Sequence, residues 1–434
     1  MSSENARPGR FHWRRPVRIL LLVAVVAVAV WQTRVHTAAW GDLKEGRAAL
    51  QRDDPAEARR HLERCLTEWP QSGEANLLAA QAARRCGDLD AAQKYLKRAD
   101  RFGRAAADIE VEQALVRAQS GYLGEVEPAF VKWIVDGHPQ ANEMIALLVP
   151  VYLADFRIVE VGKLTATWVE LRPNSPKAWA YRADVLERLR SNRELVIAAR
   201  RRLAELTPDD RVARLNLVRV LLVTRQPPDE AAGHLEWLLA ADPVDPPVLV
   251  QLAACREAQG RPDEAVAILD RVIAAAPGNA KALFDRGRLE MNRGRPVEAI
   301  RFLRRSAELD PSNDELLYTL FLCVRQTGTA EEARAAEERW RRCANDLQRV
   351  SELGRAIGAA PDKPELRCEI GELFLRNGQT VEGLRWLESA LRIDPRHAPT
   401  HRALAAHYER TGRPDLARHH NALTTDPSKR DPDQ

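Results

Sequence analysis

Residues 260–277 read GRPDEAVAILDRVIAAAP, and residues 294–311, which begin 34 positions later, read GRPVEAIRFLRRSAELDP. Each stretch begins with glycine, carries alanine at its sixth position and leucine at its tenth, and ends with proline. The closing proline recurs at intervals of 34 or 35 residues, apart from one double-length gap and one stretched gap, at Pro70, Pro139, Pro173, Pro208, Pro243, Pro277, Pro311, Pro361 and Pro395. A period in this range predicts a solenoid of stacked helical hairpins.

Further columns share the period, and each has a mechanical reason. A turn glycine is expected to end the first helix of each hairpin in a left-handed backbone conformation; these glycines are Gly87, Gly260, Gly294, Gly328, Gly378 and Gly412. Small residues such as Gly371 and Gly383 are expected on facing helices, where they let the helix axes approach closely. Leu387, one turn beyond Gly383, is expected to fill the groove that the small residues open. The proline stops the second helix, because the residue before it is disfavoured in the helical region.

The combined pattern of small residue, turn glycine, second small residue, leucine and closing proline resembles the tetratricopeptide repeat. The match is nearly complete at 378–395, GQTVEGLRWLESALRIDP, and in the helix before it; the matching residues are Ile370, Gly371, Phe374, Gly378, Gly383, Leu387, Ala390 and Pro395. The resemblance covers residues 39–427. It implies an all-α fold, a right-handed α-solenoid of about eleven such repeats. The sequence before the repeats predicts one further, hydrophobic helix at the N-terminus.

Two regions depart from the family pattern. The repeats around 107–208 are degenerate, with Glu127 and Val196 where alanine is expected. An insertion around 346–361, DLQRVSELGRAIGAAP, adds either length to a second helix or a separate helix.

The N-terminus is a separate element. A basic segment, 1–18, carries five arginines and precedes an unbroken apolar run from Ile19 to Trp31. We expect 19–33 to be a signal-anchor or transmembrane helix, although a run of this length also fits the core of a cleaved signal peptide. The surplus of arginine before the run keeps the N-terminus in the cytoplasm and exports the remainder.

The expected location is therefore the bacterial cytoplasmic membrane, in a single pass, with the solenoid on the periplasmic side and residues 428–434 as a disordered tail. The bacterial assignment rests on the excess of arginine over lysine and on the abundant alanine, which indicate GC-rich coding.

Composition and motifs exclude several classes of function. The net charge of +4 is small for 434 residues and does not indicate nucleic-acid binding. The sequence contains no phosphate-binding loop, nucleophile elbow, HExxH or CxxC motif, and repeats occupy nearly the whole chain. The C-terminal histidines lack the spacing of metal ligands. We therefore expect no enzyme activity, no cofactor, no metal and no small-molecule substrate, and in the register of the repeats we also expect the six cysteines to be unpaired.

The candidate site is a set of arginines late in the first helices, two or three residues before the turn. In this family the first helices line the concave groove in which peptides commonly bind, so these arginines are candidates for gripping an acidic segment or a free C-terminus. The alternative is that they only complement the negative ends of the helix dipoles. The residues are Arg84, Arg85, Arg188, Arg325, Arg376 and Arg410.

The resemblance implies scaffolding or assembly work. Together with the expected N-terminal helix, it predicts a membrane-tethered scaffold or adaptor that binds other proteins or peptides. An alternative of a different class is an accessory subunit of a complex for polysaccharide synthesis, polysaccharide export or secretion in the cell envelope.

Overall fold

The computed structural model of the chain describes residue 34 and residues 36–424. These residues form α-helices and one short π-helical segment, and no strand occurs among them, which confirms the all-α prediction. The predicted hydrophobic helix at 19–33, the basic segment before it and the tail at 428–434 lie outside the described residues. Within 36–424, no helix is both long and apolar enough to span a bilayer.

The chain divides into two compact units, one ending at Leu148 and the other beginning at Val149. The first unit contains the helix over 36–51, α2 (Pro55–Glu68), α3 (Gly73–Arg85), α4 (Leu89–Arg101), α5 (Ala106–Arg117), η1 (Ala118–Tyr122) and α6 (Leu123–Val135). The unit boundary falls inside α7 (Ala141–Ala154).

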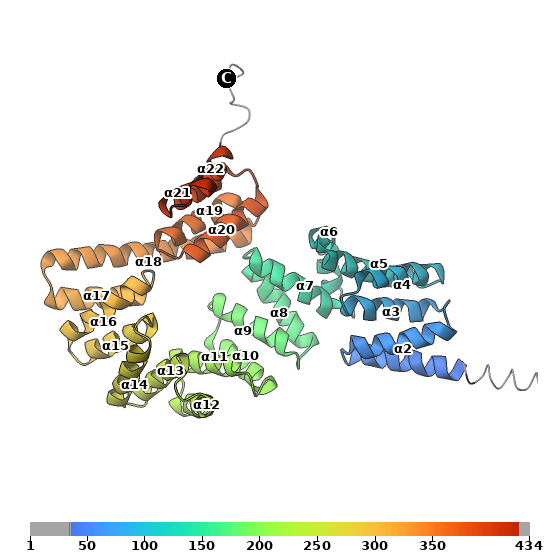
Figure 1. Cartoon of the computed structure of the whole chain (residues 1–434), viewed down its shortest axis with the longest axis horizontal. Helices are drawn as coiled ribbons and strands as arrows, with labels where there is room; N and C mark the ends of the chain where they lie inside the picture. Colours follow the sequence, from blue (N-terminus) through green and yellow to red (C-terminus); the bar gives the residue numbers. More distant parts are fainter. Residues whose placement is uncertain (1–33, 35, 425–434) are drawn as a thin grey trace, which may run out of the picture. The chain divides into compact units, whose positions relative to one another are not determined.

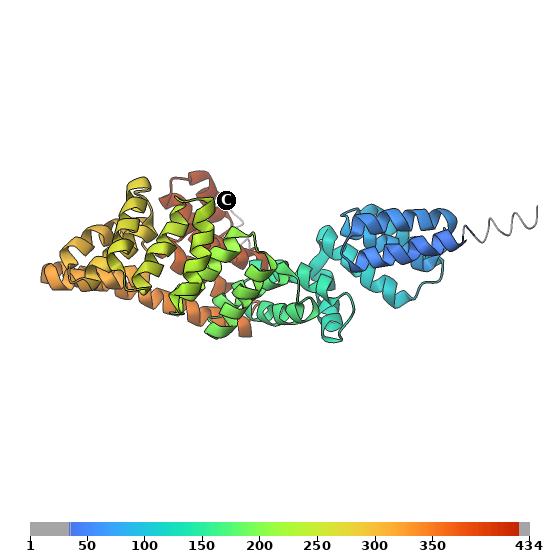
Figure 2. The same ribbon diagram turned by 90° about the horizontal axis from the view of Figure 1, so that it is seen from below.

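The second unit continues with helices of similar length, apart from α18. They are α8 (Ile158–Leu171), α9 (Pro176–Arg188), α10 (Arg193–Leu206), α11 (Arg211–Val223), α12 (Pro228–Ala241), α13 (Pro246–Ala258), α14 (Pro262–Ala275), α15 (Ala280–Asn292), α16 (Pro296–Leu309), α17 (Asp314–Thr327), α18 (Ala330–Ala359), α19 (Pro364–Arg376), α20 (Thr380–Ile393), α21 (Ala398–Arg410) and α22 (Pro414–Ala422). Among the described residues, the helix over 36–51 and helices α2 to α22 follow the order expected of eleven helix pairs. In the second unit, successive pairs lie side by side (Figures 1 and 2).

The predicted turn glycines lie at the C-terminal ends of the first helices. Five of the six turn glycines have positive φ, from +71° at Gly412 to +82° at Gly87. Gly328 is the exception, with an extended backbone at φ −96° and ψ −176°. The prediction was wrong there because α17 continues to Thr327 and Thr329 begins α18 directly, with Glu332 completing a reciprocal cap.

Four turns place a residue other than glycine in the left-handed region. They are Asp53, Phe156, Arg190 and Arg225, with φ between +49° and +62°. A side chain in this conformation costs roughly 1–2 kcal/mol. Three of the four turns follow α7, α9 and α11, so they extend through the degenerate repeats and just beyond them.

The predicted interlock between facing helices is present. In the pair α19/α20, a Cβ placed on Gly371 would lie 2.7 Å from Cγ of Leu387 and 3.0 Å from the carbonyl oxygen of Gly383. In the pair α15/α16, a Cβ on Gly287 would lie 2.7 Å from Cγ of Leu303. The leucine therefore occupies the volume that the missing side chain leaves, as expected for closely packed helices.

The insertion around 346–361 resolves into one long helix. α18 has 30 residues, about 45 Å at the usual rise per residue, and its C-terminal half includes the inserted stretch. Leu353 and Ile357 in that half are buried against Ile370 and Leu373 of α19. The insertion thus lengthens a second helix and does not add a separate one.

The degenerate region contains an irregular connection. α5 passes into η1 without a regular turn, and Gly121 inside η1 has φ +96°. Pro128 lies inside α6 and Pro150 inside α7, where each removes a backbone donor from its helix. The departures from the family pattern in this region are therefore matched by departures from regular helix geometry.

The six cysteines are free, and all except Cys86 are buried. Burial raises the pKa of the Cys323 and Cys343 thiols to about 11. The Cys323 sulfur lies 3.3 Å from that of Met291, so this thiol is a packing element of the core.

The interlock predicts the effect of a larger side chain. Gly371→Val should lower the free energy of unfolding by about 1–3 kcal/mol, because Leu387 and the backbone at Gly383 leave no room for it. Gly354→Val is the matched control, since Gly354 is also helical and a Cβ there would meet no atom within 4 Å. Urea unfolding followed by circular dichroism compares the two variants, and equal midpoints would contradict the interlock.

Candidate functional site

Two of the predicted arginines are committed to a buried ion-pair cluster in the first unit. Arg84, only 2% exposed, donates to Glu112 Oε1 at 2.5 Å and to Glu143 Oε2 at 2.6 Å. Arg85 donates to the other oxygen of Glu143 at 2.5 Å and to the carbonyl of Leu50 at 2.9 Å. Both guanidinium groups are thus committed to carboxylates inside the fold, although the Nε of Arg85 is buried without a hydrogen-bond partner.

The cluster controls the protonation of Glu143. Burial alone would raise the pKa of this carboxyl, but Arg84 and Arg85 lower it below its ordinary value. Gln140 completes the cluster by donating to Glu112 Oε2 at 2.9 Å. The arrangement is that of a buried, hydrogen-bonded charge network.

The remaining predicted arginines lie at the surface of the second unit, each on a different helix. Arg376 pairs with Asp346 of α18, and the guanidinium of Arg325 lies over the ring of Phe321 with its centroid 5.2 Å away. Arg188 and Arg410 are exposed, and their side chains have no hydrogen bond or ion pair with another described residue. Among the described residues these four side chains do not contact one another, so they do not form one common site.

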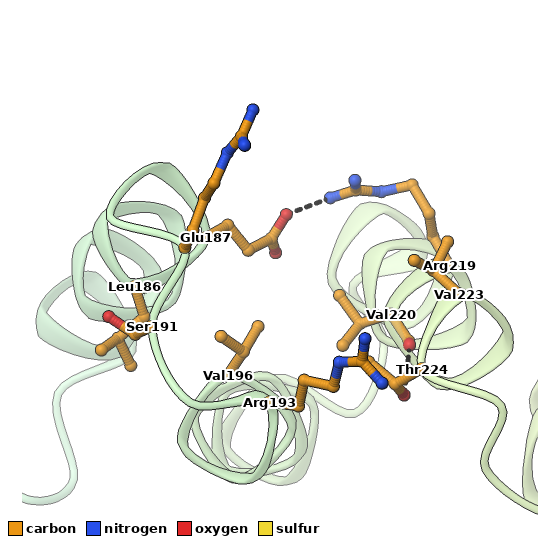
Figure 3. A pocket seen from close by; sticks show the side chains of 10 residues that line it. Leu186, Glu187, Ser191, Arg193, Val196, Arg219, Val220, Val223 and Thr224 are labelled. Atoms are coloured by element: carbon orange, nitrogen blue, oxygen red, sulfur yellow. Dashed lines mark hydrogen bonds and ion pairs between the residues drawn. The ribbon is translucent and has the colours of Figure 1, made fainter. Parts of the chain in front are cut away.

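A hollow lies at the C-terminal end of α9, the helix that carries Arg188. It has a volume of about 210 Å³ and lies between the last turns of α9 and α11 and the first turn of α10 (Figure 3). Leu186, Val196 and Val220 supply apolar surface, and Val223 at the edge is 76% exposed. An aliphatic side chain would therefore find apolar surface in this hollow.

The rim of the hollow is cationic. Arg190, Arg193 and Arg219 line it, and Arg219 donates to Glu187 at 2.6 Å across the opening (Figure 3). Glu187 also accepts from Arg200 at 2.7 Å, so the one carboxylate among the lining residues is shared between two guanidinium groups. The side chains of Arg190 and Arg193 have no hydrogen bond or ion pair with another described residue.

The turn after α9 positions these arginines. Arg190 takes the left-handed conformation at φ +49°, and the N–H groups of Arg190 and Ser191 donate to the carbonyls of Glu187 and Leu186, each at 3.0 Å. This is the hydrogen-bond pattern that usually accompanies a glycine after a helix. An arginine in that place puts a cation at the edge of the hollow.

The sequence prediction missed Arg190 and Arg193 because it considered only the late positions of the first helices. Two signals were available in the sequence. Arg190 and Arg225 replace the turn glycine in consecutive repeats, and Glu187 and Arg219 are 32 residues apart, close to the repeat length. Residues separated by about one repeat lie on equivalent helices of neighbouring pairs.

The described residues bring together no group of three or more potential metal ligands. Among the C-terminal histidines, His420 lies near two others: its Nδ1 is 2.9 Å from that of His401, and its ring centroid is 5.3 Å from that of His419. His401 also bonds through Nε2 to the carbonyl of Pro395, so its ring is held by the fold.

The comparisons with known proteins identify the repeats. One family model described as tetratricopeptide repeat matches residues 215–280, 256–314 and 284–347, and a second with the same description matches residues 49–115. The chain contains tetratricopeptide repeats. These matches confirm the predicted repeat family, and proteins built from tetratricopeptide repeats are generally non-catalytic scaffolds.

Solved structures resemble this chain only distantly. PilW, a type IV pilus biogenesis factor, is 21% identical with a TM-score of 0.38, and the match covers 46% of this chain and 91% of PilW. MamA from Desulfovibrio magneticus RS-1 is 17% identical with a TM-score of 0.34, covering 40% of this chain and 97% of MamA. The Cut9–Hcn1 assembly of the APC/C is 13% identical with a TM-score of 0.33, and the match covers 92% of this chain and 91% of the chain in that assembly. At these values the likenesses carry no conclusion about partners. No match to a curated protein was found.

The same substitution should destabilise the protein strongly at a buried arginine and hardly at all at an exposed one. Arg84→Met should lower the free energy of unfolding by about 3–5 kcal/mol, because it leaves Glu112 and half of Glu143 buried without a cation. Arg188→Met, on an exposed side chain, should change it by less than about 0.5 kcal/mol.

Denaturant unfolding at several pH values measures the unfolding free energies of the Arg84→Met and Arg188→Met variants. Because the pKa of Glu143 is lowered in the folded state, its contribution is present above the unfolded value of about 4.5 and is lost as pH falls through the folded value. The difference in unfolding free energy between the wild type and Arg84→Met should therefore become smaller below about pH 4. A difference that stays constant down to pH 2 would contradict the assignment.

Proposed function

We propose that this tetratricopeptide repeat protein is a non-enzymatic scaffold that binds acidic segments of partner proteins at the hollow between α9, α10 and α11. The observation that carries the proposal is the pair of unpartnered guanidinium groups, Arg190 and Arg193, beside an apolar hollow. Guanidinium groups bind carboxylates in bidentate geometry, and the exposed Val223 offers an adjacent apolar contact.

Charge supports an acidic partner over a basic one. Between residues 184 and 225 the sequence carries ten arginines against six aspartates and glutamates. Asp184, Glu187 and Glu205 already pair with arginines of the same segment. An acidic peptide would meet a surplus of unpaired positive charge, whereas a basic one would meet repulsion.

We further propose that the scaffold is tethered to the bacterial cytoplasmic membrane and exported. The basis is the sequence of residues 1–34, with five arginines before the apolar run at Ile19 to Trp31 and one after it. A tether of this kind would present the repeats to envelope proteins.

Site-specific photocrosslinking in cells tests where partners bind. p-Benzoylphenylalanine at Val223, which lines the hollow, should give a crosslinked protein, and the same residue at Val297 should give much less. Both valines are highly exposed, so they form a matched pair. The crosslinked segment, sequenced by mass spectrometry, should carry net negative charge.

Charge reversal supplies the control for this experiment. Arg190→Glu with Arg193→Glu should reduce the Val223 crosslink about tenfold or more, since it removes two charge-assisted contacts. Arg271→Glu, on an exposed arginine of α14 without a side-chain partner among the described residues, should leave it unchanged. Equal yields at Val223 and Val297, or no effect of the double reversal, would count against the site.

The proposed orientation has its own measurement. Alkaline phosphatase fused after residue 434 should be active, because the enzyme folds only after export. Replacing the arginines at 7, 10, 14, 15 and 18 with glutamate should reduce the activity, because orientation depends on this basic segment. An inactive fusion to the unaltered chain would show that the repeats remain in the cytoplasm.

A further inference from the structure

The turn between α7 and α8 contacts helices more than two hundred residues later in the second unit (Figure 1). In a repeat array each unit ordinarily contacts only its neighbours, so such a contact is not needed to build the array. The turn consists of residues 154–157, and it lies against α19 and α20.

A buried arginine holds the backbone of this turn. The guanidinium of Arg367, in a residue that is 2% exposed, donates to the carbonyl oxygen of Asp155. The same guanidinium donates to Ser389 Oγ at 2.8 Å and to the carbonyl of Pro361 at 3.2 Å, which fixes its orientation. No carboxylate of a described residue lies within ion-pair distance of Arg367, so it serves here as a donor to carbonyl groups.

Two side chains of the turn, those of Asp155 and Phe156, also contact α20. The ring of Phe156 stacks on Trp386 of α20, with centroids 3.4 Å apart and planes 17° from parallel. Arg392 donates to the Asp155 carboxylate at 3.2 Å and to the carbonyl of Ala154 at 2.8 Å. The surface of α19 and α20 therefore contacts three features of the turn: its backbone carbonyls, an aspartate and the aromatic residue that follows it.

The docked turn can be displaced. Asp155 and Arg392 form their ion pair at the edge of the contact, where their side chains are 36% and 49% exposed. Phe156 has φ +57°, a conformation unfavourable for a residue with a side chain. In the receiving hairpin, Ile370 and Leu387 are fully buried in two apolar clusters, one shared with α18 and the other with α21, and no residue of the turn belongs to either cluster.

We propose that this face of α19 and α20 is a second protein-binding site, specific for a turn in which aspartate is followed by an aromatic residue. The chain's own turn at 154–157 fills the site, and a partner protein carrying the same chemistry binds by displacing it. The site stands apart from the hollow between α9 and α11, because it uses Arg367, Trp386 and Arg392 and none of the residues that line that hollow.

A peptide from the chain itself is the probe. The acetylated, fluorescein-labelled dodecamer PVYLADFRIVEV, residues 150–161, is added to the full-length protein in detergent and its anisotropy is measured. The variant Asp155→Ala with Phe156→Gly vacates the site, and glycine keeps the left-handed turn without strain. This variant should bind the peptide at least about tenfold more tightly than the wild type, because no internal turn competes.

Substitutions in the receiving surface test specificity. In the vacated variant, Trp386→Leu should weaken binding about tenfold, since it removes the stacking partner. Trp237→Leu, on a partly exposed tryptophan of α12, is the control and should have no effect. A peptide with alanine in place of the phenylalanine should not bind.

A measurement on the unaltered protein avoids dependence on any variant. Saturating unlabelled peptide should speed amide hydrogen exchange at residues 154–157, because the internal turn is released. Equal affinity of the wild type and the vacated variant, no binding to the vacated variant, or no effect of Trp386→Leu would overturn the proposal. Failure of this site would leave the acidic-segment site between α9 and α11 unaffected, because the photocrosslinking at Val223 tests that site separately.

Discussion

The structure depends on the close approach of two helices within each pair. Where Gly287 or Gly371 faces its partner helix, a leucine side chain fills the space of the absent Cβ, and the helix axes can lie near each other only because that atom is missing. Each pair thereby buries an apolar seam, and stacking buries the outer faces of successive pairs. The surfaces proposed above as binding sites are built on this repeated joint.

The joint could be predicted from the sequence because its causes are local. A small residue, a leucine four positions later, a glycine at the turn and a proline after the second helix all act within one repeat. Gly328 could not be predicted in the same way, since its backbone is determined by the cap that Thr329 and Glu332 form at the next helix. The continuous α18 was left open for a related reason: whether an inserted stretch continues a helix depends on the neighbour against which Leu353 and Ile357 pack.

Charges were less predictable than the fold. The late-helix arginines occupy similar places in their repeats, yet Arg84 is buried among carboxylates and Arg188 is exposed without a partner. The difference comes from residues 28 and 59 positions away, Glu112 and Glu143, which supply the opposite charge in one case. A desolvated cation requires such partners. The neighbouring repeats therefore determine whether an arginine is buried in an ion pair or exposed, and its position within its own repeat does not.

Arg190 and Arg225 stand where most repeats have the turn glycine, and both hold the left-handed backbone that glycine adopts at no steric cost. A consensus sequence made from the repeats would place glycine at both positions and would gain stability there. It would also remove the cation of Arg190 from the rim of the hollow and that of Arg225, the residue after Thr224, which lines the hollow. Stability and the proposed binding at the hollow therefore make opposing demands on Arg190, which lines the hollow.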